Sequence, residues 1–281
     1  MKSLYIPAYA KINLFLEILS KRDDGFHNIE SVMHTVSLFD GVTIEINDSG
    51  KITLDCPALD IPAEKNIAWK AAKRFADRSG ICDGIRITIE KRIPWEAGLG
   101  GGSSDAGAVL RGLNKIYRTF TAEQLCDIAA EIGSDVPFCV RGGCMLAKGR
   151  GEILSPLAPM PDCTILIAKG EGGSSTAKAY AAADSQGFIP KENDIIEPLN
   201  TGDLYTLSDR LFNRFEDTAP YALPIKDVMT SCGALSSLLS GSGSAVFAIF
   251  DDKEKAERAK ELLILKGYFA ETCVPVNQAD V

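Results

Sequence analysis

Residues 94–106 read PWEAGLGGGSSDA, with four glycines at five successive positions. The alternating apolar residues of 85–89 predict a strand before this stretch, and apolar residues at helical spacing over 106–116 predict a helix after it. A glycine-rich loop between a strand and a helix lets backbone N–H groups approach an anion, and the helix dipole favours negative charge there. The loop therefore predicts a phosphate-binding site rather than a flexible turn that happens to be rich in glycine.

Two common nucleotide motifs do not fit this loop. The Walker pattern needs a Lys followed by Ser or Thr after the last glycine, whereas Gly102 is followed by Ser103 and Ser104. The dinucleotide fingerprint counted from Gly98 would need a glycine where Ser103 stands. That fingerprint also belongs near the start of a parallel sheet, and here about ninety residues of mixed strands come first. The sequence thus argues against a Walker protein and against NAD binding.

The composition is that of an acidic globular protein. Lys and Arg number 30 and Asp and Glu number 38, which gives a formal net charge of −8 and a pI near 5.0. Such a chain has no diffuse positive field for nucleic acid or for an anionic membrane. Polar residues interrupt its apolar N-terminal stretch, which argues against a signal peptide or a membrane span. We expect neither a nucleic-acid nor a membrane partner, and the sequence indicates no oligomeric state.

The cysteines and histidines do not form a metal-binding pattern. The eight cysteines are scattered without any C-x-x-C, and the chain has only two histidines. A zinc site is therefore not expected, and reduced thiols in a cytoplasmic protein are the simpler interpretation.

Periodicity divides the chain into mixed strands and helices. Residues 9–18 alternate as a strand does, which places Lys11 and Asn13 side by side on one face. The first part is predicted to contain strands over 9–18, 42–46, 51–54 and 85–89 and helices over 66–77, 106–116 and 122–132. The second part is predicted to contain strands over 164–168, 245–250 and 269–274 and helices over 176–183, 203–215, 225–230 and 252–265. Three prolines within 155–162 predict a linker, and so an α+β protein of two lobes, 1–155 and 156–281.

Five blocks of sequence, in order, resemble the motifs of the GHMP kinases. They are PAYAKINLFLEI (7–18), RDDGFHNIES (22–31), the loop 94–106, IGSDVPFCVRGG (132–143) and LLSGSGSAVFAIF (238–250). The resemblance covers essentially the whole chain, and the loop has the form typical of the diphosphocytidyl-methylerythritol kinases. It implies a two-lobed fold with the active site between the lobes. The N-terminal lobe would be like the second domain of ribosomal protein S5, and the C-terminal lobe ferredoxin-like.

Kinases of this superfamily transfer the γ-phosphoryl group of ATP to an alcohol. The resemblance implies phosphorylation of the 2-hydroxyl of 4-diphosphocytidyl-2-C-methyl-D-erythritol, a step of non-mevalonate isoprenoid synthesis, with ATP and Mg²⁺ as cofactors. Another GHMP kinase, acting on mevalonate, homoserine or a sugar, is the alternative enzyme. A catalytically silent relative that only binds a ligand is the alternative from a different class, although retention of Lys11, Asn13 and Asp135 argues for activity.

The resemblance assigns the catalytic roles to Lys11 and Asp135. The aspartate would accept or position the hydroxyl proton, and the lysine would stabilise charge at the reacting centre. A solvated strand lysine and a helix cap ahead of Pro137 are the structural alternatives. Ser104 is the implied Mg²⁺ ligand, although Ser103 and Ser104 could simply cap the helix. The residues implied to bind ATP are Asn66, Lys91, Pro94, Ala97, Gly98, Leu99, Gly100, Gly101, Gly102, Ser103 and Ser104.

The second block and the C-terminal lobe supply the implied cytidine pocket. Phe26 and Tyr180 would sandwich the pyrimidine between two rings, and His27 would read its edge. Phe26 departs from the family pattern, in which tyrosine is commoner, so stacking is kept while a hydroxyl contact is lost. A place in the core is the alternative for both rings. The residues implied to bind the acceptor substrate are Asn13, Phe26, His27, Asp135, Thr176, Tyr180, Gly241, Ser242 and Gly243.

Overall fold

Two long antiparallel strands organise the first half of the chain. The computed structural model describes residues 2–59, 61–171, 175–186, 189–192 and 194–277. In it, β1 (Lys2–Lys21) and β2 (His27–Asn47) pair from Lys2 opposite Ile46 to Lys21 opposite His27. Both strands extend well beyond the alternation seen in the sequence. Three register shifts interrupt the ladder, and each shift breaks the period-2 pattern on which a strand prediction depends.

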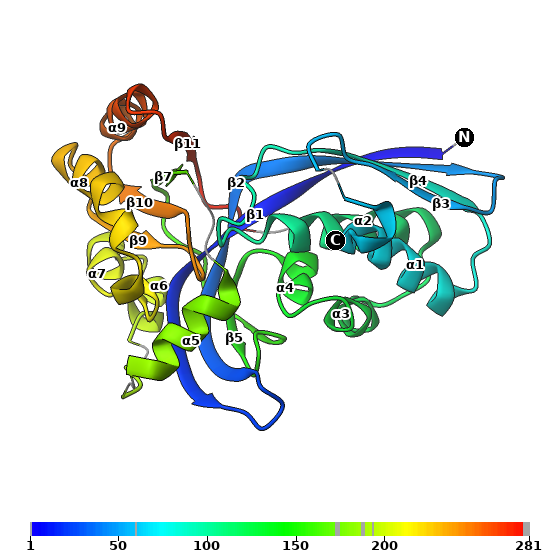
Figure 1. The fold of residues 1–281 in the computed structure, drawn as a ribbon, viewed down its shortest axis with the longest axis horizontal. Helices are drawn as coiled ribbons and strands as arrows, with labels where there is room; N and C mark the ends of the chain where they lie inside the picture. Colours follow the sequence, from blue (N-terminus) through cyan, green and yellow to red (C-terminus); the bar gives the residue numbers. More distant parts are fainter. Residues whose placement is uncertain (1, 60, 172–174, 187–188, 193, 278–281) are drawn as a thin grey trace.

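The large sheet contains seven strands, with helices packed on one side of it (Figure 1). Its main path is β3-β4-β2-β1-β8, and β5 pairs with both β2 and β6. The strands after β2 are β3 (Ile52–Asp55), β4 (Gly84–Glu90), β5 (Cys144–Lys148), β6 (Ile153–Pro156) and β8 (Phe212–Asn213). The helices are α1 (Ile67–Ser79), α2 (Gly101–Tyr117), α3 (Ala122–Ala130) and α4 (Val136–Arg141), with a 3₁₀ turn at Ala63–Lys65.

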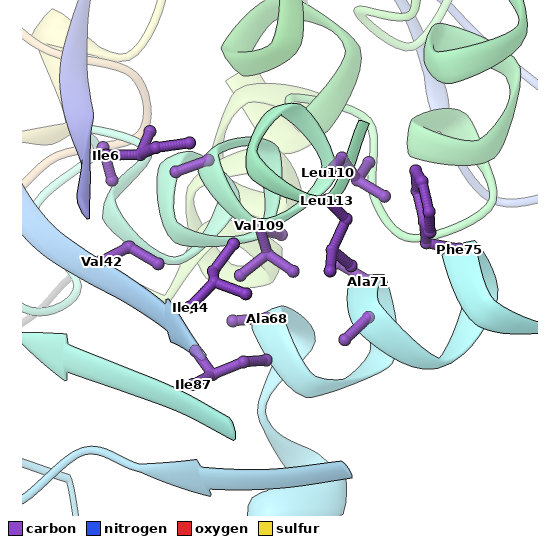
Figure 2. Close-up of a cluster of buried hydrophobic side chains, with 14 of the residues drawn as sticks. Ile6, Val42, Ile44, Ala68, Ala71, Phe75, Ile87, Val109, Leu110 and Leu113 are labelled. Carbon is purple, nitrogen blue, oxygen red and sulfur yellow. The ribbon is translucent and has the colours of Figure 1, made fainter. Parts of the chain in front are cut away.

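The contact between α1, α2 and the sheet forms the core of this half. Ala68, Ala71, Ala72 and Phe75 of α1 recur at three- and four-residue spacing and are fully buried. Figure 2 shows this face meeting apolar side chains of α2 and of the strands. Because Phe75 is buried on every side, its truncation to alanine would cost about 3–5 kcal/mol of stability. The packing of α2 fixes the glycine loop at its N-terminus.

The second half is a four-stranded antiparallel sheet covered by helices. Its strands are β7 (Thr164–Lys169), β9 (Ser236–Leu239), β10 (Val246–Phe250) and β11 (Phe269–Cys273), in the order β11-β7-β10-β9. The helices are α5 (Thr176–Gln186), α6 (Ile196–Thr201), α7 (Leu204–Asp209), α8 (Leu223–Ser231) and α9 (Lys253–Leu265), with 3₁₀ turns at Glu216–Thr218 and Pro220–Ala222. This order and the β-α-β-β-α-β succession confirm the ferredoxin-like prediction.

The helix predicted over 203–215 is wrong in its second part. Helix α7 ends at Asp209, and β8 then pairs in parallel with β1 through Phe15–Phe212 and Leu16–Asn213. The Asn213 side chain donates to the carbonyls of Leu239 and Gly241 at 2.7 and 2.8 Å. These are tertiary contacts, so the local pattern of apolar residues could not predict them. Strands β5, β6 and β9 and helices α4 and α6, each of six residues or fewer, were not predicted.

The two halves share packing and hydrogen bonds. One hydrophobic cluster contains Ile12 and Leu14 of β1 together with Ile167 of β7 and Phe247 of β10. Glu17 of β1 is fully buried and paired with Arg214. The division at residue 155 stays a prediction, and β6 runs across it. No helix within the described part of the chain is long and apolar enough to cross a membrane.

Candidate active site

The glycine loop turns directly into α2. Gly98 and Gly100 have φ values of +73° and +72°, a region that glycine alone enters without strain. A Cβ on Gly98 would overlap the carbonyl oxygen of Ser240, and one on Gly100 would lie 3.0 Å from Cγ of Lys11. Gly100 is the N-cap of α2 and no side chain caps this terminus, so the capping alternative for Ser103 and Ser104 is wrong. The first backbone N–H groups of α2 are therefore available to a phosphate.

Both halves of the protein hold the loop in place. The backbone N–H of Lys11 donates to the carbonyl of Leu99 at 3.0 Å. From the opposite side, Ser240 Oγ donates to the carbonyl of Gly98 at 3.0 Å, and the backbone N–H of Ala245 donates to the carbonyl of Ala97 at 3.0 Å. The loop is thus fixed between β1 and the turn that precedes β10.

The predicted catalytic pair comes together beside this loop. Lys11 Nζ lies 3.8 Å from Asp135 Oδ2 and donates to Asn13 Oδ1 at 2.7 Å. Asn13 in turn donates to Ser31 Oγ at 2.8 Å, which fixes the amide. Lys11 is only 4% exposed, so it is not a solvated surface lysine. Asp135 occupies the N-cap position of α4 but makes no capping hydrogen bond, so its carboxylate is directed to other partners.

A cavity of about 660 Å³ opens beside this pair. It brings together eleven predicted site residues: Lys11, Asn13, Phe26, His27, Gly98, Gly100, Asp135, Thr176, Tyr180, Gly241 and Ser242. Gly241 lies close to the lysine, since a Cβ on it would be 3.3 Å from Lys11 Nζ. Gly243 lines an adjoining cavity of about 480 Å³ together with Ser242.

A smaller cavity of about 240 Å³ lies along the same loop. It shares Gly98 and Gly100 with the large cavity, and the other predicted residues on its wall are Lys91, Pro94, Ala97, Leu99, Gly101, Gly102 and Ser103. Asn66 and Ser104 lie apart from these walls. The Asn66 side chain accepts the N–H of Ala68 as the cap of α1, and Ser104 is buried with its hydroxyl 3.5 Å from the Cys139 sulfur.

Beneath the loop lies a buried cluster of three charged side chains. Lys91 Nζ donates to Asp105 Oδ2 at 2.7 Å and also contacts Asp40, while Asp40 Oδ1 accepts the backbone N–H of Ile93 at 2.8 Å. Burial raises the pKa of Asp105 to about 7 against the nearby charge of Lys91. Burial would lower the pKa of Lys91, but the two carboxylates outweigh it and raise that pKa. The amino group of Lys91 points into this cluster. The predicted contact of Lys91 with adenine stays a prediction.

Aromatic side chains form the far wall of the large cavity. The rings of His27 and Tyr180 stack with centroids 4.6 Å apart and planes at 21°, and Phe215 meets Tyr180 edge-on at 4.9 Å. Phe26 is 51% exposed, with the Arg150 guanidinium 5.0 Å from its ring centre. Phe26 and Tyr180 thus face one cavity, but the stacking partner of Tyr180 among the described residues is His27 rather than Phe26.

Comparison with known proteins identifies the family. The family models for the GHMP kinase N-terminal and C-terminal domains match residues 66–143 and 195–266. A 4-diphosphocytidyl-2-C-methyl-D-erythritol kinase of Alkaliphilus metalliredigens is 39% identical over 271 residues, which cover 94% of this chain and 93% of the relative. One of Exiguobacterium sibiricum is 42% identical over 263 residues, covering 91% and 92%. The chain belongs to the 4-diphosphocytidyl-2-C-methyl-D-erythritol kinase family.

Solved structures agree with this family. A crystal structure of 4-(cytidine 5'-diphospho)-2C-methyl-D-erythritol kinase superposes with a TM-score of 0.82 at 33% identity, covering 96% of this chain and 99% of that one. The mevalonate kinase of L. major in complex with R-mevalonate superposes at 0.72 with 20% identity, covering 98% and 96%, and shows the common fold alone. The two-lobed GHMP kinase fold is therefore established for this member of the 4-diphosphocytidyl-2-C-methyl-D-erythritol kinase family.

The cavity residues of this kinase that were missed from the sequence include Arg150, Phe215 and Asp184. Arg150 and Phe215 reach the cavity through tertiary packing, and no local pattern marks them. Asp184 does have a signal, because it follows Thr176 and Tyr180 at successive intervals of four on α5 and so lies on the same helix face. Its carboxylate accepts from His27 Nε2 at 2.8 Å and from Lys21 Nζ at 2.6 Å.

Proposed function

We propose that this protein transfers the γ-phosphoryl group of ATP to the 2-hydroxyl of 4-diphosphocytidyl-2-C-methyl-D-erythritol, in the non-mevalonate route to isoprenoid precursors. The observation that carries the proposal is the placement of Lys11 and Asp135, 3.8 Å apart, on the wall that joins the glycine loop to the aromatic end of one cavity. Relatives about 40% identical over nearly the whole chain bear the name of this kinase.

Phosphoryl transfer is mostly positioning and electrostatic stabilisation, and Lys11 and Asp135 suit these tasks. Asp135, whose side chain is 34% exposed, accepts or positions the proton of the attacking hydroxyl. The Lys11 ammonium stabilises charge on the phosphoryl group in transfer. It is held for this by Asn13, which is itself held by Ser31. Because these hydrogen bonds already hold the ammonium in position, the site does not need to reorganise during the reaction.

We place the nucleotide phosphates over the first turn of α2. Gly100 supplies the left-handed turn that exposes the helix N-terminus, and the small cavity along the loop offers space for the rest of the nucleotide. The described residues gather no group of three His, Cys, Asp or Glu side chains that could hold a metal ion. Mg²⁺ does not need such a group, because it commonly binds through nucleotide phosphates with one or two protein ligands. The role of Ser104 as a ligand stays a prediction.

The site of action is proposed to be the cytoplasm. All eight cysteines are unpaired, and burial raises the pKa of the Cys139, Cys144 and Cys273 thiols to about 12, which keeps them unreactive. Eight unpaired cysteines suit a reducing compartment.

A coupled ADP-release assay tests the function. The cytidine substrate should support turnover, whereas mevalonate, homoserine and galactose at equal concentration should support little. Turnover with one of the other alcohols instead would reassign the protein within the GHMP kinases. Binding of the cytidine substrate in calorimetry without any ADP release would make the protein a ligand-binding relative.

A further inference from the structure

Asp184 joins three separate segments at the mouth of the large cavity. It lies on α5, while Lys21 ends β1 and His27 begins β2. One carboxylate oxygen, Oδ1, contacts His27 Nε2 at 2.8 Å, and the other, Oδ2, accepts from Lys21 Nζ at 2.6 Å. His27 is 8% exposed, and Tyr180, one turn before Asp184, stacks on its ring. One face of α5 therefore fixes both the position of the His27 ring, through Tyr180, and its hydrogen bonding, through Asp184.

The contact with Asp184 determines which ring nitrogen of His27 carries the proton. A lysine ammonium can only donate a hydrogen bond, a nitrogen of neutral histidine can either donate or accept, and an ionised carboxylate can only accept. The Lys21 hydrogen bond lowers the pKa of Asp184 below its ordinary value, with a further contribution from His27, so the group is ionised near neutral pH. Nε2 of His27 must therefore be the N–H, and Nδ1 of the neutral ring is left with a lone pair.

Nδ1 is the remaining polar atom of a ring that lines the cavity, and it has no hydrogen-bond partner among the described residues. An acceptor at this position suits a base edge that donates. Cytosine presents an exocyclic amine where uracil presents a carbonyl oxygen. A lone pair facing that carbonyl would leave two acceptors opposed and both unsatisfied.

We propose that Asp184 is a positioning residue that selects cytosine over uracil by holding His27 in the Nε2–H form, so that Nδ1 accepts from the exocyclic amine. The inference rests on the proposed function, and it assigns a role to a residue that does not itself touch the base. Lys21 has a defined part in it, because it fixes the second carboxylate oxygen.

Asp184→Asn is the informative variant because of Lys21. Lys21 can only donate, so it holds the amide oxygen, and the amide NH₂ is left facing His27 Nε2. Nε2 must then accept, which moves the ring proton to Nδ1 and reverses the polarity offered to the base. The ratio of kcat/KM for the cytidine substrate over its uridine analogue should fall by roughly five- to 150-fold, the effect of leaving one polar group unpaired. KM for ATP should not change.

Two matched variants separate this mechanism from loss of a structural contact. Lys21→Met alone should keep the cytidine-to-uridine ratio, because the carboxylate still accepts from His27. In the double variant Lys21→Met with Asp184→Asn, the amide is free to turn its oxygen to His27, so the ratio should return towards that of the wild type. A merely structural role for Asp184 predicts instead that the double variant is at least as impaired as Asp184→Asn.

The tautomer itself can be read without turnover by ¹⁵N NMR of histidine-labelled protein at about pH 8, above the ordinary histidine pKa. The chain has only two histidines. His34 Nδ1 contacts the carbonyl of Thr35 at 2.8 Å and its Nε2 accepts from the N–H of Met160 at 3.1 Å, so His34 is an Nδ1–H reference. His27 should give the opposite, Nε2–H pattern, and Asp184→Asn should convert it to the pattern of His34.

The outcomes keep this inference distinct from the proposed function. If wild-type protein does not phosphorylate the cytidine substrate, the proposed function fails, and the tautomer spectra with titration of cytidine and uridine 5'-diphosphates still test Asp184. An Nδ1–H signature for His27 in the wild type overturns the inference. So does a cytidine-to-uridine preference, in turnover or in diphosphate binding, that Asp184→Asn leaves within about twofold of the wild type.

Discussion

The two ends of the cleft are constructed in different ways. The nucleotide end comes from one continuous segment, 91–105, in which the loop, its glycines and the start of α2 follow one another. The acceptor end collects side chains from β1, the 22–27 turn, α5 and the turn at 241–242. The residues that line the nucleotide end all lie in the first half, although Ser240 and Ala245 of the second half also hold the loop. A site made from distant segments depends on how the two lobes pack, so substrate recognition is tied to that packing.

Burial differs between the ends as well. Asp40 is fully buried and Asp105 is 2% exposed beneath the glycine loop, whereas Phe26 at the acceptor end is 51% exposed. Buried, mutually paired charges hold a backbone rigidly, and their removal is costly. Exposed rings are free to adjust to a ligand. Changes at the nucleotide end should therefore affect stability and ATP together, and changes at the acceptor end should affect the alcohol substrate alone.

The largest effect is expected where the two ends meet. Asp135→Asn and Lys11→Met should each lower kcat by about 10²–10⁴-fold, because each removes a group that acts on the transferring phosphoryl group or on the attacking hydroxyl. Steady-state kinetics should show little change in either KM. The Asp135→Asn variant is nearly isosteric, so its unfolding midpoint serves as the control. A loss below about tenfold in both variants would place the chemistry elsewhere in the cleft.

The next effect concerns the joint between the halves. His34 of β2 accepts from the backbone N–H of Met160, which lies between β6 and β7. Burial lowers the pKa of His34 from 6.5 to about 4. Between pH 6.5 and pH 4, His34 of the unfolded chain binds a proton that His34 of the folded protein does not bind. The stability that the neutral, buried His34 provides is therefore fully present above pH 6.5 and is lost as the pH falls towards 4.

The size of this loss is up to about 3 kcal/mol. Urea unfolding should be measured near pH 7.5 and near pH 4.5 for the wild type and for His34→Gln. The decrease in the free energy of unfolding between the two pH values should be smaller in His34→Gln by about this amount. The glutamine does not titrate and can still accept from Met160. Equal pH dependence in both proteins would remove His34 as the sensitive group. Activity per folded molecule should stay constant, since His34 lies in neither end of the cleft.

The same contrast explains what the sequence predicts. The glycine turn that leads into a helix was predictable from residues 97–105 alone, because glycine permits backbone conformations that other residues avoid and a helix begins there. Placing Lys11 beside Asn13 followed from strand alternation, and the hydrogen bond between them confirms it. Bringing Asp135 to Lys11, over 120 residues away, depended on the family resemblance, because no local pattern connects α4 to β1.

The acceptor end shows where sequence reasoning stops. Phe26, His27 and Tyr180 were each placed in one pocket, but a stacking pair is a matter of tertiary geometry, and the ring on Tyr180 is His27. Strand β8 was hidden inside a predicted helix because its pairing with β1 is set by Asn213 and its distant carbonyl partners. Within the glycine loop, Gly98 and Gly100 have positive φ values and Gly101 and Gly102 do not, a difference that the sequence alone does not reveal.

At the acceptor end, Tyr180→Ala should raise KM for the cytidine substrate. Stacking of a base on an aromatic ring contributes about 1–3 kcal/mol, or roughly five- to 150-fold in affinity. KM for ATP should stay nearly unchanged, because Tyr180 lies on the wall away from the loop cavity. Tyr180→Phe is the matched control, since it keeps the ring that stacks on His27 and meets Phe215. An equal rise in both KM values would show that the two ends are not independent.

At the nucleotide end, Gly100→Ala should weaken ATP binding by roughly five- to 30-fold, because a left-handed conformation costs an alanine about 1–2 kcal/mol. In the variant, the loop relieves that strain by leaving the left-handed conformation at the start of α2. ATP binding must then restore that conformation, and the free energy needed for this reduces the affinity. The added Cβ would also press on Lys11, 3.0 Å from its Cγ. Gly102→Ala is the control two residues along: its φ is not positive, a Cβ there meets Ile67 Cδ1 at an ordinary 3.5 Å, and alanine favours the helix. Calorimetric titration with a non-hydrolysable ATP analogue should separate the two variants. If both bind the analogue as tightly as the wild type, the phosphates do not rest on this loop, and the contrast between a locally built nucleotide end and a dispersed acceptor end loses its first half.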